Sequence, residues 1–161
     1  MGQRELIKRC AAALLLVCFG AGAASAACSE DVVRVVGDFG QANFKVDVAD
    51  DNQERAQGLM FVESMPTLGG MLFVYDQPGH ATFWMRNTLI PLDMLFITPA
   101  GVVSHIHENA IPGDETTIDG GKGILAVLEI NGGLSSRLGI TEGAMIQHPS
   151  FGADSVLPCP K

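Results

Sequence analysis

The sequence predicts a mainly β protein: a compact single domain, either a β-barrel or a β-sandwich, with two short helices. Short apolar or alternating runs of strand length recur along the chain, and Gly, Pro, Asn and Asp separate them. Only two segments, residues 53–57 and 134–138, have helix-like sequences, and both are short. The chain shows no internal repeat, so many short strands around one core favour a barrel or a sandwich.

The first 26 residues have the features of an export signal. Arg4, Lys8 and Arg9 precede an apolar run over residues 11–24, and Ala24-Ser25-Ala26 fits the small-residue rule for signal peptidase. We therefore expect a signal peptide over residues 1–26 and a single mature domain over residues 27–161. The alternative is a lipid-anchored Cys28, but Ser25 stands where a Leu would favour lipidation.

These features predict a periplasmic or secreted protein that makes no stable membrane insertion after the signal is cleaved. The whole chain carries a net charge of −8, and the signal contributes three cations and one anion, so the mature chain carries −8 − 2 = −10. Such a chain is repelled by nucleic acid and by anionic membrane surfaces, so we expect neither as a partner.

Two cysteines remain after removal of the signal, at the two ends of the mature chain. They are Cys28 and Cys159. In an oxidising compartment the simplest expectation is one disulfide that ties the termini together. A catalytic thiol is the weaker interpretation, because neither cysteine has a His or a Cys-x-x-Cys partner nearby in the sequence.

The first half of the mature chain predicts three strands and one helix. Residues 32–36 form a short apolar run, and residues 44–48 alternate between apolar and polar. Asp50-Asp51-Asn52 offers a helix N-cap, residues 53–57 a short helix, and Gly58 its end. Residues 71–75 are a further apolar run of strand length.

A hairpin is the clearest local feature. Residues 92–97 and 102–108 flank Thr98-Pro99-Ala100-Gly101, which fits a type I turn closed by a glycine bulge. The register that pairs Thr98 with Val102 sets up three further pairs: Phe96 with Ser104, Leu95 with His105, and Asp93 with His107.

The last third of the chain begins with a long loop. Residues 111–123 are polar and Gly-rich, and loops of this length are often functional. A buried-type strand over 124–130, the helix over 134–138 and a last strand over 144–148 follow.

The stretch from Thr82 to Phe96 holds the only Trp of the chain. Read with a period of two from His80, it places Trp84 and Arg86 on one face of a strand and Phe83 and Met85 on the other. An aromatic plane beside a planar cation is a pairing suited to binding. The alternative is an Arg that stacks on Trp84 and closes the edge of the core.

Charged residues within apolar runs are the other informative feature, because an unpaired buried charge is costly. Arg86, Asp93 and Glu129 stand in such runs, and Arg55 is a fourth. One interpretation is an internal ion-pair network. The other places Asp93 and Glu129 as a carboxylate pair in a cleft beside Trp84, acting as general acid and base or binding a sugar. We expect Glu129 to be structural, and Asp93 to lie nearer the surface beside Arg86 and Trp84.

Several segments together resemble a known family of exported proteins, domain of unknown function 192. They are Gly58-Leu59-Met60-Phe61, Gly70-Met71-Leu72-Phe73, Phe83-Trp84-Met85-Arg86-Asn87-Thr88, Pro91-Leu92-Asp93-Met94-Leu95-Phe96 and Val127-Leu128-Glu129-Ile130. The resemblance covers residues 44–146 and implies a compact, mostly β single domain. Arg86 stands where a Lys is more usual. The resemblance brings no activity, because the family has none assigned.

Metal binding has weak support in the sequence. His105 and His107 lie at i, i+2 on a predicted strand and would face the same way, a spacing that can serve one zinc or copper ion. The segment is equally consistent with an exposed polar edge, and the Met residues stand in core-like runs. We expect no bound metal and no cofactor.

These observations predict a ligand-binding face built from a small set of residues: Trp84, Arg86, Asn87, Thr88, Asp93 and Glu129. The expected function is non-catalytic binding of a small or polysaccharide-like ligand, or of an envelope protein. The first alternative is a small hydrolase-like envelope enzyme that uses Asp93 and Glu129. The second is a periplasmic metal-handling protein.

Overall fold

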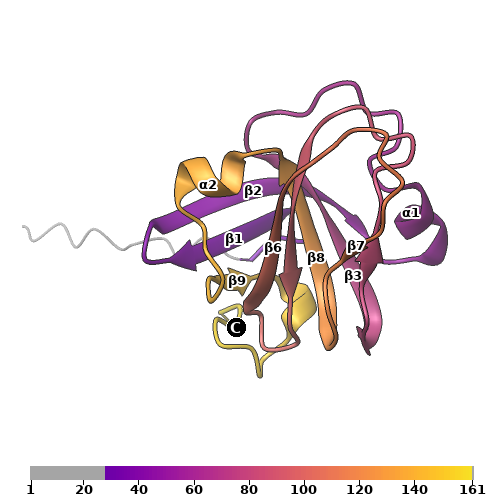
Figure 1. The fold of residues 1–161 in the computed structure, drawn as a ribbon. Helices are drawn as coiled ribbons and strands as arrows, with labels where there is room; N and C mark the ends of the chain where they lie inside the picture. Colours follow the sequence, from indigo (N-terminus) through magenta and orange to yellow (C-terminus); the bar gives the residue numbers. More distant parts are fainter. Residues whose placement is uncertain (1–27, 161) are drawn as a thin grey trace, which may run out of the picture.

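A computed structural model describes residues 28–160 of the chain (Figure 1). The predicted signal peptide, residues 1–26, and its cleavage site lie outside the described residues. Within residues 28–160, no helix is long and apolar enough to cross a membrane.

The described chain is mainly β, as the sequence predicts (Figure 1). Its elements in order are β1 (Val32–Gly37), β2 (Gly40–Ala49), α1 (Asn52–Gln57), β3 (Gly69–Gly79), β4 (Thr82–Phe83), β5 (Leu92–Ile97), β6 (Val103–Ala110), β7 (Ile118–Asp119), β8 (Ile124–Asn131), α2 (Leu134–Leu138), β9 (Met145–Gln147) and a 3₁₀ turn, η1 (Pro149–Phe151).

Seven strands form one curled sheet in the order β6-β5-β8-β3-β2-β1-β9, and β4 pairs with β7 in a small second sheet. The neighbours are antiparallel except β2 and β3, which run parallel with α1 in the connection between them. The two edges of the large sheet meet at an isolated bridge between Val102 and Met145. The Val103 amide also donates to the Ala144 carbonyl at 2.9 Å. The sheet is therefore a half-barrel whose edge strands touch.

The central strands of the large sheet are buried on both faces. The sheet therefore separates two hydrophobic clusters. All seven strands contribute to the cluster on the concave side, which includes Phe44, Leu72 and Leu95. The second cluster, with Phe73, Met94 and Phe96, lies on the outer face of β3, β5 and β8. Continuous apolar runs in β5 and β8 are the sequence signal of strands covered on both sides.

Two segments cover the outer cluster, residues 80–90 and 111–121, which we call the cover segments. They include β4 and β7 and contribute Ala81, Met85 and Ile118 to the outer cluster. Gly120 packs directly on Phe96, because a Cβ added at Gly120 would lie 2.0 Å from the Phe96 ring. The long loop predicted over 111–123 is thus docked on the sheet. The strand expected from His80 to Arg86 is reduced to the two residues of β4.

Helix α1 begins and ends as its sequence predicts. The Asp51 carboxylate accepts hydrogen bonds from the amides of Gln53 and Glu54, at 2.7 and 2.8 Å. The Gly58 backbone has φ 49°, a conformation that favours glycine.

The hairpin of β5 and β6 forms, but the predicted register holds only near its turn. Ile97 pairs with Val103 as that register requires. A bulge then shifts the pairing, so that Phe96 faces His105 and Met94 faces His107. The predicted pairs of Phe96 with Ser104, Leu95 with His105, and Asp93 with His107 are therefore wrong. Ser104 is the inserted residue, and its hydroxyl donates to the Phe96 carbonyl at 3.2 Å.

The two ends of the described chain are joined by a disulfide between Cys28 and Cys159, with Cα atoms 5.6 Å apart and a sequence separation of 131. This agrees with the expectation from the sequence. Such a bridge restricts the unfolded chain over almost its whole described length.

We expect reduction of this disulfide to lower the free energy of unfolding by about 2–4 kcal/mol. Denaturant titrations with and without reductant measure the effect, and a Cys28→Ser/Cys159→Ser variant should show no response to reductant. Identical transition midpoints for the oxidised and reduced wild-type protein would contradict the prediction.

Candidate functional site

A pocket of about 230 Å³ lies on the outer face of the sheet between α1, β3, β4 and β8. Figure 1 shows α1 and β3, two of the elements that line it, on the same side of the molecule. Its lining combines aromatic side chains with a few polar groups: Arg55, Gln57, Phe73, Tyr75, Thr82, Phe83, Trp84, Arg86, Thr88 and Glu129. A concavity that combines apolar side chains with a few converging polar groups is typical of a small-molecule site.

Glu129 lines this pocket from within the sheet. It pairs with Met71 of β3 and Met94 of β5, and its side chain lies on the outer face with the second hydrophobic cluster. Only 4 % of the residue is exposed. Among residues 28–160, no fully enclosed side-chain nitrogen or oxygen lacks a hydrogen-bond partner. Because the Glu129 carboxyl makes no hydrogen bond to another described residue, its oxygens must open to the pocket.

Burial raises the pKa of Glu129 from its ordinary 4.5 to about 8. Desolvation by burial is the cause. At neutral pH the carboxyl is therefore mostly protonated and able to donate a hydrogen bond into the pocket. A strongly shifted pKa in a concave site is a recognised mark of functional residues.

Trp84 and Arg86 form the rim of the pocket. The Arg86 Cζ atom lies 5.6 Å from the centre of the Trp84 ring, within the range of a cation–π contact. Trp84 is 48 % exposed, whereas Phe83 and Met85 pack into the outer cluster. The alternation predicted around Trp84 is therefore present, and the Arg86 guanidinium has no ion pair within residues 28–160.

Arg55 and Tyr75 form the opposite wall. The Arg55 Cζ atom lies 5.5 Å from the Tyr75 ring centre. The Arg55 guanidinium donates to the carbonyls of Asp50 and Val74, at 2.5 and 2.6 Å, so its position is fixed. Burial raises the pKa of Tyr75 above its ordinary value, with the Glu129 carboxylate as a smaller contributor.

Asn87 and Thr88 shape the rim. Asn87 has φ 56°, and its carbonyl accepts a hydrogen bond from the Phe61 amide at 2.9 Å. Thr88 is buried and forms an isolated bridge with Met60. Of these two predicted site residues, Thr88 lines the pocket and Asn87 acts through the backbone turn.

Asp93 is fully buried, at 0 % exposure, on the concave side of the sheet. Its carboxylate accepts hydrogen bonds from the amides of Asn109, Gly133 and Ser135, at 2.8, 2.7 and 2.8 Å. It also accepts one from the Ser135 hydroxyl at 2.5 Å. Gly133 is the N-cap of α2 and has no side chain to cap it, so Asp93 supplies that role from β5.

The predicted pairing of Asp93 with Glu129 in one cleft is wrong. Asp93 pairs with Ile130, whose side chain belongs to the concave cluster, and Met94 of the outer cluster pairs with Glu129. Paired residues in neighbouring strands point to the same face, so the two carboxyls lie on opposite faces. The expected positions are exchanged: Asp93 is bonded to the backbone around α2, and Glu129 is the carboxyl that lines the same pocket as Arg86 and Trp84.

The internal ion-pair network is also wrong. Within residues 28–160 the ion pairs are His80 with Asp119 and His105 with Glu142, and all four side chains are substantially exposed. Backbone amides and the Ser135 hydroxyl replace the cation expected for Asp93.

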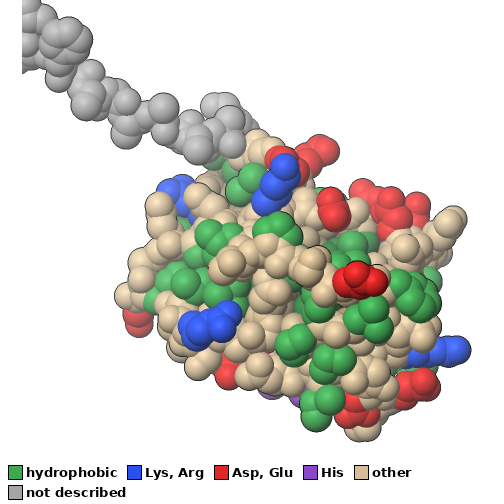
Figure 2. Space-filling model, turned by 90° about the horizontal axis from the view of Figure 1, so that it is seen from above, with side chains coloured by type: hydrophobic (Ala, Val, Ile, Leu, Met, Phe, Trp, Pro, Cys, Tyr) green, Lys and Arg blue, Asp and Glu red, His purple; other side chains and the backbone are tan. Residues whose placement is uncertain are grey.

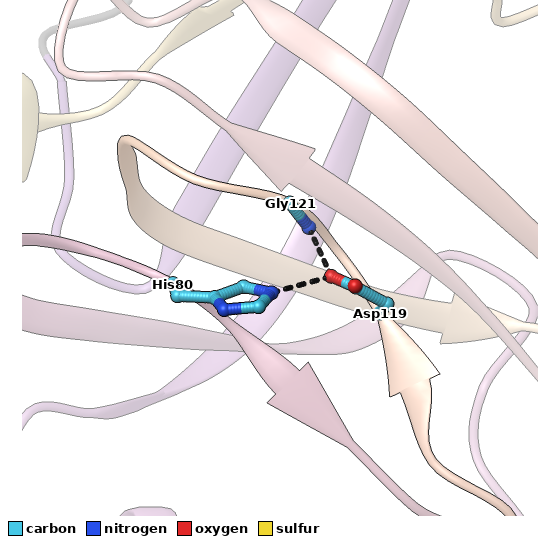
Figure 3. Close-up of polar contacts among 3 residues, drawn as sticks. All are labelled: His80, Asp119 and Gly121. Carbon is cyan, nitrogen blue, oxygen red and sulfur yellow. Dashed lines mark hydrogen bonds and ion pairs between the residues drawn. The ribbon is translucent and has the colours of Figure 1, made fainter.

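The cover segments are tied together beside the pocket by the first of these pairs (Figure 3). The His80 Nε2 atom lies 2.7 Å from Asp119 Oδ1, and the Gly121 amide donates to the same oxygen at 2.8 Å. The His80 hydrogen bond, followed by that of Gly121, lowers the pKa of Asp119. Backbone hydrogen bonds between Ala81 and residues 120–121 continue this link.

His105 and His107 do not belong to a cluster. The His105 ring stacks on Phe96, with ring centres 5.8 Å apart, and its Nδ1 atom lies 3.1 Å from Glu142. No group of three or more His, Cys, Asp or Glu side chains in the described part of the chain is arranged to hold a metal ion.

Residues 34–148 match the profile of the family DUF192, described as an uncharacterized ACR. The chain belongs to that family. The match extends further toward the N-terminus than the resemblance over residues 44–146 and includes residues 34–37 of β1.

Two solved structures resemble this DUF192 domain. A protein of unknown function from Novosphingobium aromaticivorans DSM 12444 is 45 % identical with a TM-score of 0.70, covering 71 % of this chain and 82 % of that one. A protein from Sinorhizobium meliloti 1021, named a "putative transcription regulator", is 37 % identical with a TM-score of 0.73, covering 77 % of this chain and 97 % of that one. A search of curated proteins finds no match.

The site residues predicted from the sequence of this DUF192 domain omit most of the pocket lining, including Gln57, Phe73 and Tyr75. Phe73 and Tyr75 are on β3, and Gln57 ends α1. Successive side chains of residues 71–75 point to opposite faces of β3. Phe73 and Tyr75 therefore share a face with Met71, which pairs with Glu129. That shared face was a signal for a site wall, but only the pairing of β3 with β8 connects it to Glu129.

Proposed function

We propose that this DUF192 domain is a non-catalytic binding module that holds a small ligand in the pocket between α1, β3, β4 and β8. The observation that carries the proposal is the Glu129 carboxyl, which is 4 % exposed and opens to the pocket without a hydrogen-bond partner among the described residues. A buried polar group that makes no hydrogen bond lowers the stability of a protein by roughly 1–3 kcal/mol, so its presence calls for an explanation such as a role in binding.

The volume of the pocket limits the ligand. About 230 Å³ is below the size of common drug-sized sites, which suits one small molecule or the end of a larger one. A polysaccharide would need an open groove along the surface. We therefore favour the small-ligand form of the binding function over the polymer form.

A two-carboxylate hydrolase has less support. Glu129 has the raised pKa of a general acid, but Asp93 is on the other face of the sheet and no second carboxylate lines the pocket. An envelope protein as the partner has one supporting feature: Phe61, next to Met60 of the pocket lining, is 67 % exposed. Hydrophobic side chains are also exposed at other points of the surface (Figure 2).

We place this function in the periplasm or outside the cell, on the basis of the basic and apolar N-terminal segment and the disulfide between Cys28 and Cys159. The net charge of −10 expected after signal cleavage argues against nucleic acid as a ligand. The regulator name of the Sinorhizobium meliloti relative therefore does not enter the proposal for this chain.

A fragment screen by NMR tests the proposal, because the chain has one Trp and hence one indole N–H signal, which reports on the pocket rim. We expect some small fragments at millimolar concentration to shift the Trp84 signal and to compete with one another. Thr82→Phe should weaken these hits by about tenfold or more, because Thr82 lines the pocket and is exposed enough to accept a larger side chain.

Thr141→Phe is the matched control, since Thr141 is an exposed threonine outside the pocket lining. It should leave every hit unchanged. The proposal fails if no fragment moves the Trp84 signal, or if the hits bind equally well to the Thr82→Phe protein.

A further inference from the structure

The pocket contains three ionisable groups whose charge can change or direct binding: Arg55, Arg86 and Glu129. The Arg55 guanidinium is bonded to two backbone carbonyls and to Asn52, at 2.5, 2.6 and 2.8 Å. Arg86 is exposed, and its guanidinium makes neither an ion pair nor a hydrogen bond to another residue within 28–160, so it is available to a ligand.

The charge of the pocket is opposite in sign to that of the domain. With the Glu129 carboxyl protonated, the lining carries two positive charges and no negative one, although acidic residues outnumber basic ones in the chain by 18 to 10. A concentrated positive charge in a concave site attracts anions. The face of the Trp84 ring that would hold an organic cation is already in contact with Arg86, and this contact disfavours a cationic ligand.

The positions of these groups divide the ligand into three parts. Arg86 at the rim suits a carboxylate or phosphate, which its planar guanidinium binds in a bidentate manner. Phe73, Phe83 and Trp84 suit an apolar body between rim and floor. The Glu129 carboxyl, unpartnered and deep in the pocket, suits an oxygen that accepts a hydrogen bond.

We propose that the ligand is a small organic anion, bound through its charged group by Arg86 and through a hydroxyl or carbonyl oxygen by the buried Glu129 carboxyl that lines the pocket. This inference rests on the proposed function and specifies its ligand class. Carboxylates and phosphate monoesters share the required chemistry. Loss of the proton from Glu129 places a negative charge in the same pocket and weakens anion binding.

The other groups that face Glu129 do not change charge in the relevant range. Tyr75 on β3 has a pKa raised above its ordinary value of 10.0. The side chains on α1 and after β4 are the arginines Arg55 and Arg86, and a guanidinium keeps its charge in proteins. From β5, the residue paired with Glu129 is Met94, which does not titrate. A change of affinity between about pH 7 and about pH 9.5 therefore reports on Glu129.

The test uses a matched pair of probes, 4-(hydroxymethyl)benzoate and its neutral isostere 4-(hydroxymethyl)benzamide, titrated against the Trp84 indole signal. At about pH 7 the benzoate should bind at least about tenfold more tightly than the benzamide. Arg86→Gln should abolish this preference. Arg137→Gln, which removes an exposed cation on α2 far from the pocket, should change neither.

Titrations at a second pH distinguish the contribution of Glu129 from that of Arg86. Raising the pH to about 9.5 should weaken benzoate binding by about tenfold in the wild type and leave it unchanged in Glu129→Gln, whose amide still donates a hydrogen bond. Phenyl phosphate, with the same controls, distinguishes a phosphate preference from a carboxylate preference.

Equal binding of benzoate and benzamide by the wild type would overturn the anion class while leaving the pocket as a binding site. A benzoate preference that persists at high pH in the wild type would overturn the role of Glu129. If neither probe binds, the inference falls, and the fragment screen alone decides whether the pocket binds small molecules.

Discussion

Replacing Asp93 with Ala is expected to lower the free energy of unfolding by roughly 3–5 kcal/mol. The carboxylate is fully buried and accepts hydrogen bonds from the amides of Asn109, Gly133 and Ser135 and from the Ser135 hydroxyl. Its removal leaves these donors without an acceptor and removes the only side chain that caps α2. Denaturant titrations of the two proteins measure the loss.

Two graded variants separate this mechanism from a general packing defect. Asp93→Asn keeps the shape of the side chain and one acceptor oxygen, but it presents an amide group to the other donors. It should therefore lower the free energy of unfolding by less than Asp93→Ala does. Ser135→Ala removes one donor and leaves the three backbone contacts, so it should cost about 1 kcal/mol. A stability of Asp93→Ala within about 1 kcal/mol of the wild type would show that the contacts to α2 do not stabilise the fold.

The elements of the fold were largely predictable because their causes are local. Apart from Asp93, residues 92–97 are apolar on both sides of a strand, and β5 is accordingly buried on both faces. Asp51 before a short polar segment and Gly58 after it predicted α1. The hairpin register failed at Ser104, because a bulge adds one residue without any clear change in the hydrophobic pattern.

The site was only half predictable, and the reason lies in the burial of β5 and β8. Alternation identified Trp84 and Arg86, since one face of that segment is exposed and the other is not. Asp93 and Glu129 stand in strands covered on both faces, where alternation does not tell which face carries which hydrophobic cluster. Their roles were therefore exchanged.

One cue in the sequence does bear on Asp93. The helix over 134–138 follows Gly132 and Gly133, neither of which can cap it with a side chain. Its free amides need an acceptor from elsewhere in the fold. A buried carboxylate in a neighbouring strand is a natural source, but the choice between Asp93 and Glu129 requires the strand pairing.

Glu129 should make the stability of the protein fall as the pH rises. Its folded-state pKa of about 8 lies above the ordinary 4.5, so between these values the folded state holds a proton that the unfolded state has released. The contribution of Glu129 to the free energy of unfolding is therefore largest at or below about pH 4.5, and it declines as the pH rises to about 8. The full loss corresponds to roughly 3–5 kcal/mol.

Glu129→Gln isolates this contribution, because the amide cannot ionise. The variant and the wild type should be similarly stable near about pH 5, and the variant should be more stable by roughly 3–5 kcal/mol at about pH 9. His148, whose pKa is lowered by burial, acts in the opposite direction at acidic pH, but it is present in both proteins and cancels in the difference. Glu63→Gln, at an exposed position, should follow the wild type throughout.

A constant difference between wild type and Glu129→Gln across this range would mean that the carboxyl is solvated in the folded state. The pocket would then have no proton-dependent donor at its floor, and the ligand chemistry inferred from Glu129 would lose its basis.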